Sequence, residues 1–330
     1  MRFFFGWIRA LAPAVALMAW TGGSAAGAPQ VVIASGAPWQ AGSESLQAHG
    51  GGILRVGRMW YWIGENKTHG SSFYANSCYS STDLMHWKFV NDTLKLQPSG
   101  DLGPDRVVER PKILYSARTR TYVMYMHIDD AKYGEAKVGV ATSPTVCGNY
   151  AYRGSFRPLG FQSRDMGLFQ DSDGSAYLLS EDREHGLRID ALSDDYLSVT
   201  RTVAVLPDME APAMIKVDGK YYLFCSHLSG WNTNDNEYAT APALRGPWSA
   251  LANFAPAGTH TFNSQTTFVL PVAGKTGTTY IYMGDRWMPK DLVSSTYVWL
   301  PLRLSSSSVS MEWHDRWRLD ADAGTWAAVP

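Results

Sequence analysis

One strand–turn–strand pattern recurs five times along this chain, and a repeat of this kind constrains the fold more than any other feature of the sequence. Each copy has an apolar strand, a turn and a second strand rich in aromatic residues, and two turns carry the hairpin dipeptides Asp173-Gly174 and Asp218-Gly219. Aromatic anchors in the second strands are separated by 45 to 61 residues, about one four-stranded propeller blade: Tyr61, Tyr122, Tyr177, Tyr222 and Tyr280. We therefore predict an all-β, five-bladed β-propeller. A β-sandwich with turns evenly spaced by chance is the alternative.

The repeat also sets the expected domain boundaries. Residues 29–330 are expected to form a single propeller domain, with blades at 46–95, 105–160, 163–206, 208–254 and 262–320. The composition agrees with a turn-rich β fold, because the chain has 30 Gly, 17 Pro and 13% aromatic residues. The 29 basic and 30 acidic side chains nearly cancel, so the sequence disfavours a surface that follows nucleic-acid phosphates.

The first 28 residues have the pattern of a secretory signal. Arg2 and Arg9 form the basic region, residues 10–20 the apolar stretch, and residues 26–28 a small-residue cleavage site. The apolar stretch is shorter than the roughly 18 residues that a membrane span needs, so we expect a secreted or periplasmic protein without membrane attachment after cleavage. Three cysteines allow at most one internal disulfide, whose pairing the sequence leaves open: Cys78, Cys147 and Cys225.

A polar side chain opens the first strand of each copy, 12 to 15 residues before the aromatic anchor. These residues are His49, Glu109, Asp165, Glu210 and Gln265. The first strand of every propeller blade lines the central channel, so five copies would aim these side chains at one place. Three are acids, and acids that converge in a water-poor funnel push one another's pKa values apart, which keeps one protonated beside a charged neighbour. The pattern indicates an acid–base catalytic site on the axis.

With these residues in place, the sequence resembles glycoside hydrolase family 43, five-bladed propeller enzymes that cut chains containing arabinose, xylose and galactose. The likeness covers about residues 44–320. In that family an Asp opens the third blade and tunes the acid, and Asp165, with Phe169 and the turn at Asp173-Gly174, matches this pattern. A Glu within Glu-x-Pro opens the fourth blade and is the general acid, which Glu210 matches.

The first blade departs from the family pattern. Most members open it with an Asp-Pro whose carboxylate is the general base, whereas this chain has His49-Gly50-Gly51-Gly52. That departure and the segment around Gln265 resemble the exo-β-1,3-galactanase subfamily, for which a fifth-blade Gln is proposed to handle the nucleophilic water. The resemblance gives Gln265 this role. Because a neutral amide is a very weak base, the carboxylate of Glu109 stays open as the alternative water-activating group.

The remaining candidates concern sugar binding. Three residues fall where the subfamily binds galactose: Glu65, Arg110 and Tyr133. Trp231 and Trp287 follow the fourth and fifth hairpins, where loops rim the funnel, so they either stack on a sugar or pack between blades. His49 lacks a second metal ligand at a known spacing, so we expect a hydrogen-bonded channel residue that helps to bind substrate, and neither a metal nor another cofactor.

These features predict a secreted, inverting glycoside hydrolase that acts as a monomer, an exo-β-1,3-galactanase releasing galactose from β-1,3-galactan. An α-L-arabinofuranosidase, β-D-galactofuranosidase or β-xylosidase of the same fold is the first alternative. A non-catalytic sugar-binding propeller is the second, but it would be expected to lose Glu210 or Asp165, and both are present. Residues 49–52 also match the oxyanion motif of esterases, yet the chain has no Gly-x-Ser-x-Gly nucleophile elbow.

Overall fold

The computed structural model describes Met1 and residues 30–329. The predicted signal segment, residues 1–28, lies outside the described residues except for Met1. Between residues 30 and 329 the fold is all-β, as predicted, with one short α-helix and three short 3₁₀-helices. None of the helices in this part of the chain has the length and apolar composition needed to cross a membrane.

Five four-stranded sheets make up most of the described chain, and within each sheet the strands pair as antiparallel neighbours in sequence order. Their strands are β4 (His49–Val56), β5 (Met59–Asn66), β6 (Ala75–Ser81) and β7 (Lys88–Lys95); β8 (Val107–Ser116), β9 (Thr121–Asp129), β10 (Lys137–Ser143) and β11 (Ala151–Phe156); β12 (Met166–Gln170), β13 (Ala176–Ser180), β14 (Leu187–Leu192) and β15 (Val199–Leu206); β16 (Glu210–Val217), β17 (Lys220–Ser226), β18 (Glu237–Ala241) and β19 (Ala252–Asn253); β20 (Gln265–Ala273), β21 (Thr278–Arg286), β22 (Thr296–Leu304) and β23 (Val309–Met311). The four strands of each sheet fall within one of the predicted blade ranges.

The turn chemistry explains how the sequence folds into these hairpins. Between β16 and β17, Asp218 and Gly219 have φ angles of 49° and 80°, and Val217 pairs with Lys220. Positive φ at both central residues is the geometry of a two-residue I′ turn, which Asp-Gly favours. The register of the pairing strands therefore follows from a dipeptide visible in the sequence.

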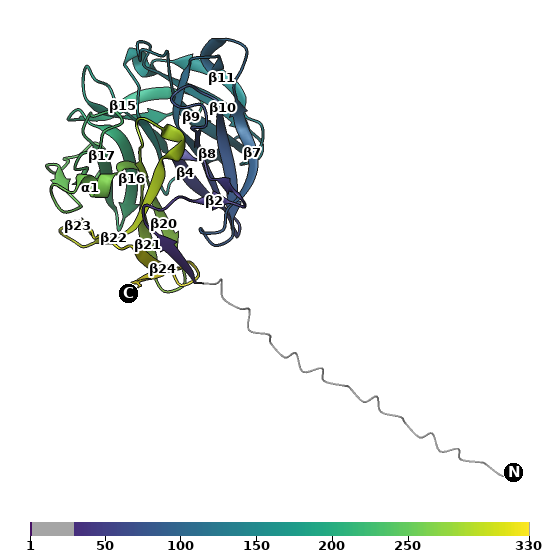
Figure 1. Cartoon of the computed structure of the whole chain (residues 1–330), viewed down its shortest axis with the longest axis vertical. Helices are drawn as coiled ribbons and strands as arrows, with labels where there is room; N and C mark the ends of the chain where they lie inside the picture. Colours follow the sequence, from purple (N-terminus) through teal and green to yellow (C-terminus); the bar gives the residue numbers. More distant parts are fainter. Residues whose placement is uncertain (2–29, 330) are drawn as a thin grey trace.

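The first strands of the five sheets lie next to one another in chain order. β4 contacts β8, β8 contacts β12, β12 contacts β16, β16 contacts β20, and β20 contacts β4 again. Figure 1 shows β4, β8, β16 and β20 in the middle of the molecule, with β4 and β20 close together although they are far apart in the sequence. This arrangement gathers the beginnings of the first strands, where the polar opening residues stand.

The two ends of the described chain meet in a further sheet. β1 (Val31–Ala34) pairs with β24 (Arg316–Asp320), which also pairs with β25 (Thr325–Ala328). The predicted fifth blade range extended to residue 320, but β24 joins this terminal sheet and not the sheet of β20. The other short elements are the hairpin of β2 (Gln40–Ala41) and β3 (Glu44–Ser45), the helix α1 (His260–Asn263), and the 3₁₀-helices η1 (Gly100–Leu102), η2 (Pro158–Gly160) and η3 (Leu292–Ser294).

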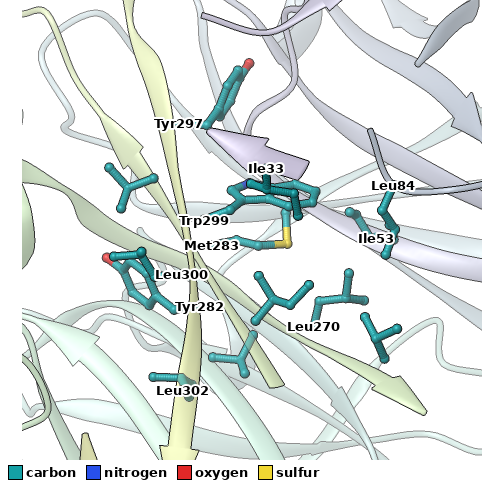
Figure 2. Close-up of a cluster of buried hydrophobic side chains, with 14 of the residues drawn as sticks. Ile33, Ile53, Leu84, Leu270, Tyr282, Met283, Tyr297, Trp299, Leu300 and Leu302 are labelled. Carbon is teal, nitrogen blue, oxygen red and sulfur yellow. The ribbon is translucent and has the colours of Figure 1, made fainter. Parts of the chain in front are cut away.

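The largest hydrophobic cluster joins the first, fourth and fifth sheets to the terminal strands. At its centre the ring centroids of Trp62 and Trp299 are 4.9 Å apart, and those of Trp62 and Trp87 are 5.4 Å apart. Figure 2 shows Trp299 packed beside Ile33 of β1 and Met283 of β21. Large rings bury much apolar surface and pack densely, so this cluster fixes how neighbouring sheets sit against one another.

A disulfide connects the first two sheets. Cys78 of β6 is bonded to Cys147, which follows β10, and their Cα atoms are 5.7 Å apart. Cys225 is buried and free. The structure thus determines the pairing that the sequence leaves open.

Candidate active site

A repeated backbone irregularity marks the opening residues. In the first, second and fourth sheets the pairing of the first two strands shifts directly after the opening residue. The next residue has a left-handed φ in each case: 56° at Gly50, 53° at Arg110 and 56° at Ala211. A bulge of this kind bends the strand and re-aims the side chains beside it. The same bulge therefore occurs in three sheets, each time directly after the polar residue that opens the first strand.

Nine of the ten candidate site residues line one pocket of about 390 Å³. They are Glu65, Glu109, Arg110, Tyr133, Asp165, Glu210, Trp231, Gln265 and Trp287, and the wall also includes Lys132, Arg183 and Gly230. Carboxylate oxygens of Asp165 lie within 4.8 Å of ligand atoms of both Glu109 and Glu210. The polar residues that open the second, third, fourth and fifth sheets are thus brought together.

His49 does not line this pocket. It is fully buried, its ring centroid lies 5.3 Å from that of Trp287, and it stacks on Tyr297 at 4.5 Å. Nδ1 of His49 lies 2.9 Å from a carboxylate oxygen of Asp285. The structure therefore places His49 behind the pocket wall, where it supports Trp287 and has no direct access to a bound sugar.

Glu210 sits in the pocket wall with both carboxyl oxygens in distinct surroundings. Oε1 accepts hydrogen bonds from Nε2 of Gln265 at 2.9 Å and from the backbone N–H of Ser229 at 3.2 Å. Oε2 faces Nη2 of Arg183 at 4.0 Å. Burial, with repulsion from Asp165 and Glu181, raises the pKa of Glu210 to about 8. The side chain is therefore protonated at neutral pH, and the proton belongs on Oε2, because Oε1 already accepts two N–H donors.

The amide of Gln265 is held in one orientation. Its Oε1 accepts hydrogen bonds from Nη2 of Arg110 at 2.5 Å and from Nε1 of Trp287 at 2.9 Å. Its Nε2 donates to Glu210 and, at 3.2 Å, to Oγ of Ser226. If the amide oxygen and nitrogen were exchanged, the amide NH2 would face the N–H donors of Arg110 and Trp287. The hydrogen-bond partners therefore fix the orientation of the amide.

Arg110 links the two halves of the site. Its Nε lies 2.8 Å from a carboxylate oxygen of Asp165, while Nη1 donates to the backbone oxygen of Thr266. Since Nη2 holds Gln265, the planar guanidinium fixes Asp165 and Gln265 relative to each other. The residue that the resemblance assigned to galactose binding is thus also a bridge within the protein.

Glu109 lies among cationic and donor groups. Tyr133 donates its O–H to Oε1 at 3.0 Å, Lys67 Nζ is 3.6 Å from the same oxygen, and His127 Nδ1 is 3.4 Å from Oε2. Burial by itself would raise the pKa of Glu109, but Lys67, His127 and Tyr133 outweigh it and lower the pKa to about 2. Glu109 is therefore a carboxylate throughout the physiological pH range, and a weakly basic one.

Glu65 and the two tryptophans complete the wall. Glu65 accepts a hydrogen bond from the backbone N–H of Arg110 at 2.8 Å and pairs with Lys67 at 2.5 Å. Trp231 and Trp287 meet edge to face with centroids 4.8 Å apart, and the Lys67 ammonium lies 5.0 Å from the Trp231 ring. Flat apolar faces beside hydrogen-bonding carboxylates suit a sugar, which has both kinds of surface.

Several residues around the pocket were not found from the sequence. Three of them stand opposite an opening residue in the hairpin register, as Glu65 stands opposite His49: His127 pairs with Glu109, Ser226 with Glu210, and Asp285 with Gln265. His127, Ser226 and Asp285 could therefore have been identified from the sequence as the cross-strand partners of the opening residues. Lys67, Lys132 and Arg183 stand in the loops after second strands, where no repeat in the sequence points to them.

Three groups of described side chains have the donor atoms of a metal site, and two of them lie at the pocket: Glu109 with His127 and Asp165, and Asp165 with Glu181 and Glu210. The chain's own cations already lie against these acids, with Arg110 on Asp165, Lys67 beside Glu109 and Arg183 on Glu181. His127 is also engaged by Asp129, 3.0 Å from its Nε2. This donor set fits hydrogen bonding to sugar hydroxyls better than it fits a metal ion.

Comparisons with known proteins agree with this site. A family model for glycosyl hydrolases family 43 matches residues 48–256. An exo-β-1,3-galactanase from Phanerochaete chrysosporium, solved with β-1,3-galactotriose, is 43% identical with a TM-score of 0.87, over 90% of this chain and 70% of that one. An exo-β-1,3-galactanase from Clostridium thermocellum is 36% identical with a TM-score of 0.86, over 90% and 68%. A β-1,3-galactosidase solved with galactodeoxynojirimycin is 32% identical with a TM-score of 0.80, over 86% and 99%.

No curated protein matched the sequence. The family model nevertheless covers more than half of the chain, and the structural relatives share at least 32% identity over most of it. The pocket supplies a protonated carboxyl group beside ionised ones, as the chemistry of glycoside hydrolysis requires. The chain is a glycosidase that hydrolyses O-glycosyl bonds, and it belongs to glycosyl hydrolases family 43.

Proposed function

We propose that this glycosidase is an inverting exo-β-1,3-galactanase that removes galactose from the non-reducing end of β-1,3-galactan. The observation that carries the proposal is the pairing of Glu210 with an amide, Gln265, in the pocket where an inverting glycosidase usually has two carboxyl groups. Relatives at 43% and 36% identity are exo-β-1,3-galactanases, and one of them was solved with β-1,3-galactotriose. These likenesses support the choice of galactan over arabinan or xylan.

We propose that residues 29–330 form one closed, five-bladed propeller. The contacts that run from β4 through β8, β12, β16 and β20 back to β4 support closure. The pairing of β1 with β24 supports it further, because it ties the beginning of the described chain to its end.

We also propose that the protein is secreted or periplasmic. The signal-like first 28 residues support this location. The disulfide between Cys78 and Cys147 supports it too, because disulfides persist in oxidising compartments.

In this proposal Glu210 is the general acid. The proton on Oε2 passes to the glycosidic oxygen as the bond between that oxygen and the galactose C1 breaks, which leaves Glu210 as a carboxylate. Asp165 and Glu181 keep the acid protonated before this step, since each disfavours a second negative charge nearby. The leaving sugar departs as a neutral alcohol.

The attacking water is assigned to Gln265, with Glu109 as the alternative. In an inverting site the two catalytic groups stand about 6.5–9.5 Å apart, which leaves room for the water. Nε2 of Gln265 lies 2.9 Å from Oε1 of Glu210, so Gln265 can hold the water only after a bound sugar has separated the two side chains. In an imidic tautomer, Oε1 of Gln265 would carry a hydrogen and would need an acceptor. Arg110 and Trp287 both present N–H donors to this atom, so Gln265 stays an amide when it orients the water. The proton of the water then passes to a carboxylate or to solvent.

A panel of substrates tests the proposal. The protein is incubated with β-1,3-galactan, arabinan, xylan and the corresponding nitrophenyl glycosides, and the released sugars are identified. The proposal predicts galactose from β-1,3-galactan alone among the polysaccharides. Release of arabinose or xylose without galactose would assign the chain to another activity of the family.

A further inference from the structure

A third carboxylate, Glu181, lies behind the acid. Glu181 directly follows β13, is 1% exposed, and has a carboxylate oxygen within 4.8 Å of those of Asp165 and Glu210. Its backbone N–H donates to the backbone oxygen of Asp165 at 2.9 Å, which continues the β12–β13 hairpin by one pair. Asp165, directly before β12, and Glu181, directly after β13, thus stand side by side at the same end of the hairpin, near Glu210.

Both carboxyl oxygens of Glu181 have a hydrogen-bond donor. Oε1 accepts a hydrogen bond from Nε of Arg183, and Oε2 accepts one from the backbone N–H of Asp165 at 3.4 Å. Hydrogen-bond donors on both oxygens favour the ionised form of a carboxyl group. Burial and Asp165 act against this charge and raise the pKa of Glu181, and Arg183 offsets them in part.

Arg183 connects Glu181 to the catalytic proton. While its Nε is bound to Glu181, its Nη2 lies 4.0 Å from Oε2 of Glu210, the oxygen that carries the proton. Arg183 lines the pocket and its side chain is 45% exposed, so little packing holds it there. Among the bonds described for Arg183, the one to Glu181 is what anchors the guanidinium beside the acid.

We propose that Glu181 is a positioning residue for the acid: its buried carboxylate anchors Arg183 over Oε2 of Glu210 and, with Asp165, sets the charge around the catalytic proton. This inference rests on the proposed role of Glu210 as general acid. A negative charge at Glu181 favours the protonated form of Glu210, and the anchored Arg183 moderates that effect so that the proton can still be given to the leaving oxygen.

The charged groups around this pair come from several elements. Those that face Glu210 are Asp165 before β12, Glu181 and Arg183 after β13, and Arg110 on β8. Those that face Glu181 are Asp165, Arg183 and His127 of β9. Glu181→Gln takes away one anion, while the amide oxygen of the new side chain can still accept the bond from Arg183, so the change favours ionised Glu210.

The test is the alkaline limb of the pH profile of kcat/KM, measured on β-1,3-galactan with the full chain. In Glu181→Gln we expect this limb to move to lower pH by about one unit or more, and in Arg183→Gln to higher pH. Glu184→Gln removes an exposed carboxylate from the same loop and should leave the limb in place. A nitrophenyl β-galactoside, whose leaving group needs no proton, should be hydrolysed by Glu181→Gln at nearly the wild-type rate.

Unshifted limbs in both Glu181→Gln and Arg183→Gln would overturn the inference, as would shifts in the same direction. The Arg183 side chain is half exposed, so Arg183→Gln should fold. Its pH profile tests the inference even if replacing the buried Glu181 unfolds the protein. Failure of the proposed function looks different, because the wild-type protein would then release no galactose from galactan at any pH.

Discussion

At Glu210, burial and the carboxylates of Asp165 and Glu181 raise the pKa of the side chain to about 8. A general acid must be protonated before it can donate, so kcat/KM on galactan should fall as the pH rises through about 8. The pH profile of the wild-type protein at fixed ionic strength measures this limb. An alkaline limb near pH 5 would show that the acid has an ordinary carboxyl pKa and that the described surroundings do not act on it.

Replacement of the acid gives a second expectation at the residue scale. Glu210→Gln should lower kcat on galactan by about 10²–10⁴-fold, because the amide is nearly isosteric and cannot donate the proton. A nitrophenyl galactoside should be affected far less, and the thermal unfolding midpoint should stay close to that of the wild-type protein. Full activity of this variant on galactan would remove Glu210 from the mechanism.

The two candidates for water activation can be separated in the same way. If Gln265 orients the water, Gln265→Ala should be nearly inactive although no ionisable group has been removed. Glu109→Gln should then mainly raise KM, since the lost carboxylate is a hydrogen-bond acceptor for the sugar. Full activity in Gln265→Ala, with an acidic limb that disappears in Glu109→Gln, would make Glu109 the water-activating group.

At the scale of single elements, the bulge after His49 depends on Gly50. Its φ is 56°, and a Cβ atom there would lie 2.0 Å from Oε1 of Glu65. Gly50→Ala should therefore displace Glu65 from its bond to the Arg110 N–H, raising KM as well as lowering stability. Gly57→Ala is the matched control, because Gly57 has a φ of 62° and open space around it.

For Gly57→Ala we expect a loss of about 1 kcal/mol in unfolding free energy from the left-handed backbone, with no change in KM. Chemical unfolding and initial rates on galactan measure both quantities. Equal KM values for the Gly50→Ala and Gly57→Ala variants would show that the bulge does not position the sugar-binding groups.

Strands and turns could be predicted from the sequence where neighbouring residues determine their conformation. Asp218-Gly219 sets its own turn, and the five opening residues follow from the repeat. The bulges were not readable, because left-handed φ at Arg110 and Ala211 is imposed by the surrounding sheets and not by a glycine. His49 was expected to bind substrate, but burial behind Trp287 depends on packing between sheets that no local pattern reports.

At the scale of the whole molecule, the Cys78–Cys147 disulfide joins two sheets across a sequence separation of 69 residues. Loop-closure entropy gives a bridge of this length about 4 kcal/mol of stabilisation. The double variant Cys78→Ser with Cys147→Ser should lose about that much unfolding free energy and keep its kcat, because neither cysteine lines the pocket. A reductant should destabilise the wild-type protein and leave the double variant unchanged; equal sensitivity of the two proteins would contradict this account.

The pairing of both chain ends in one sheet could not be predicted from the repeat. β1 has only four residues and β24 lay within the range assigned to the fifth blade, so neither strand carried a signal of its own. Their partner is set by the overall arrangement of the sheets, which brings residue 31 opposite residue 319.

The central claim is that Glu210 and a water held on the opposite face of the sugar invert a β-1,3-galactosyl bond at the non-reducing end. Hydrolysis of β-1,3-galactotriose, followed by proton NMR from the first seconds, tests it most directly. The account predicts that galactose and β-1,3-galactobiose form first, and that the galactose appears initially as the α-anomer before mutarotation. Initial release of β-galactose, or no cleavage of the trisaccharide, would contradict it.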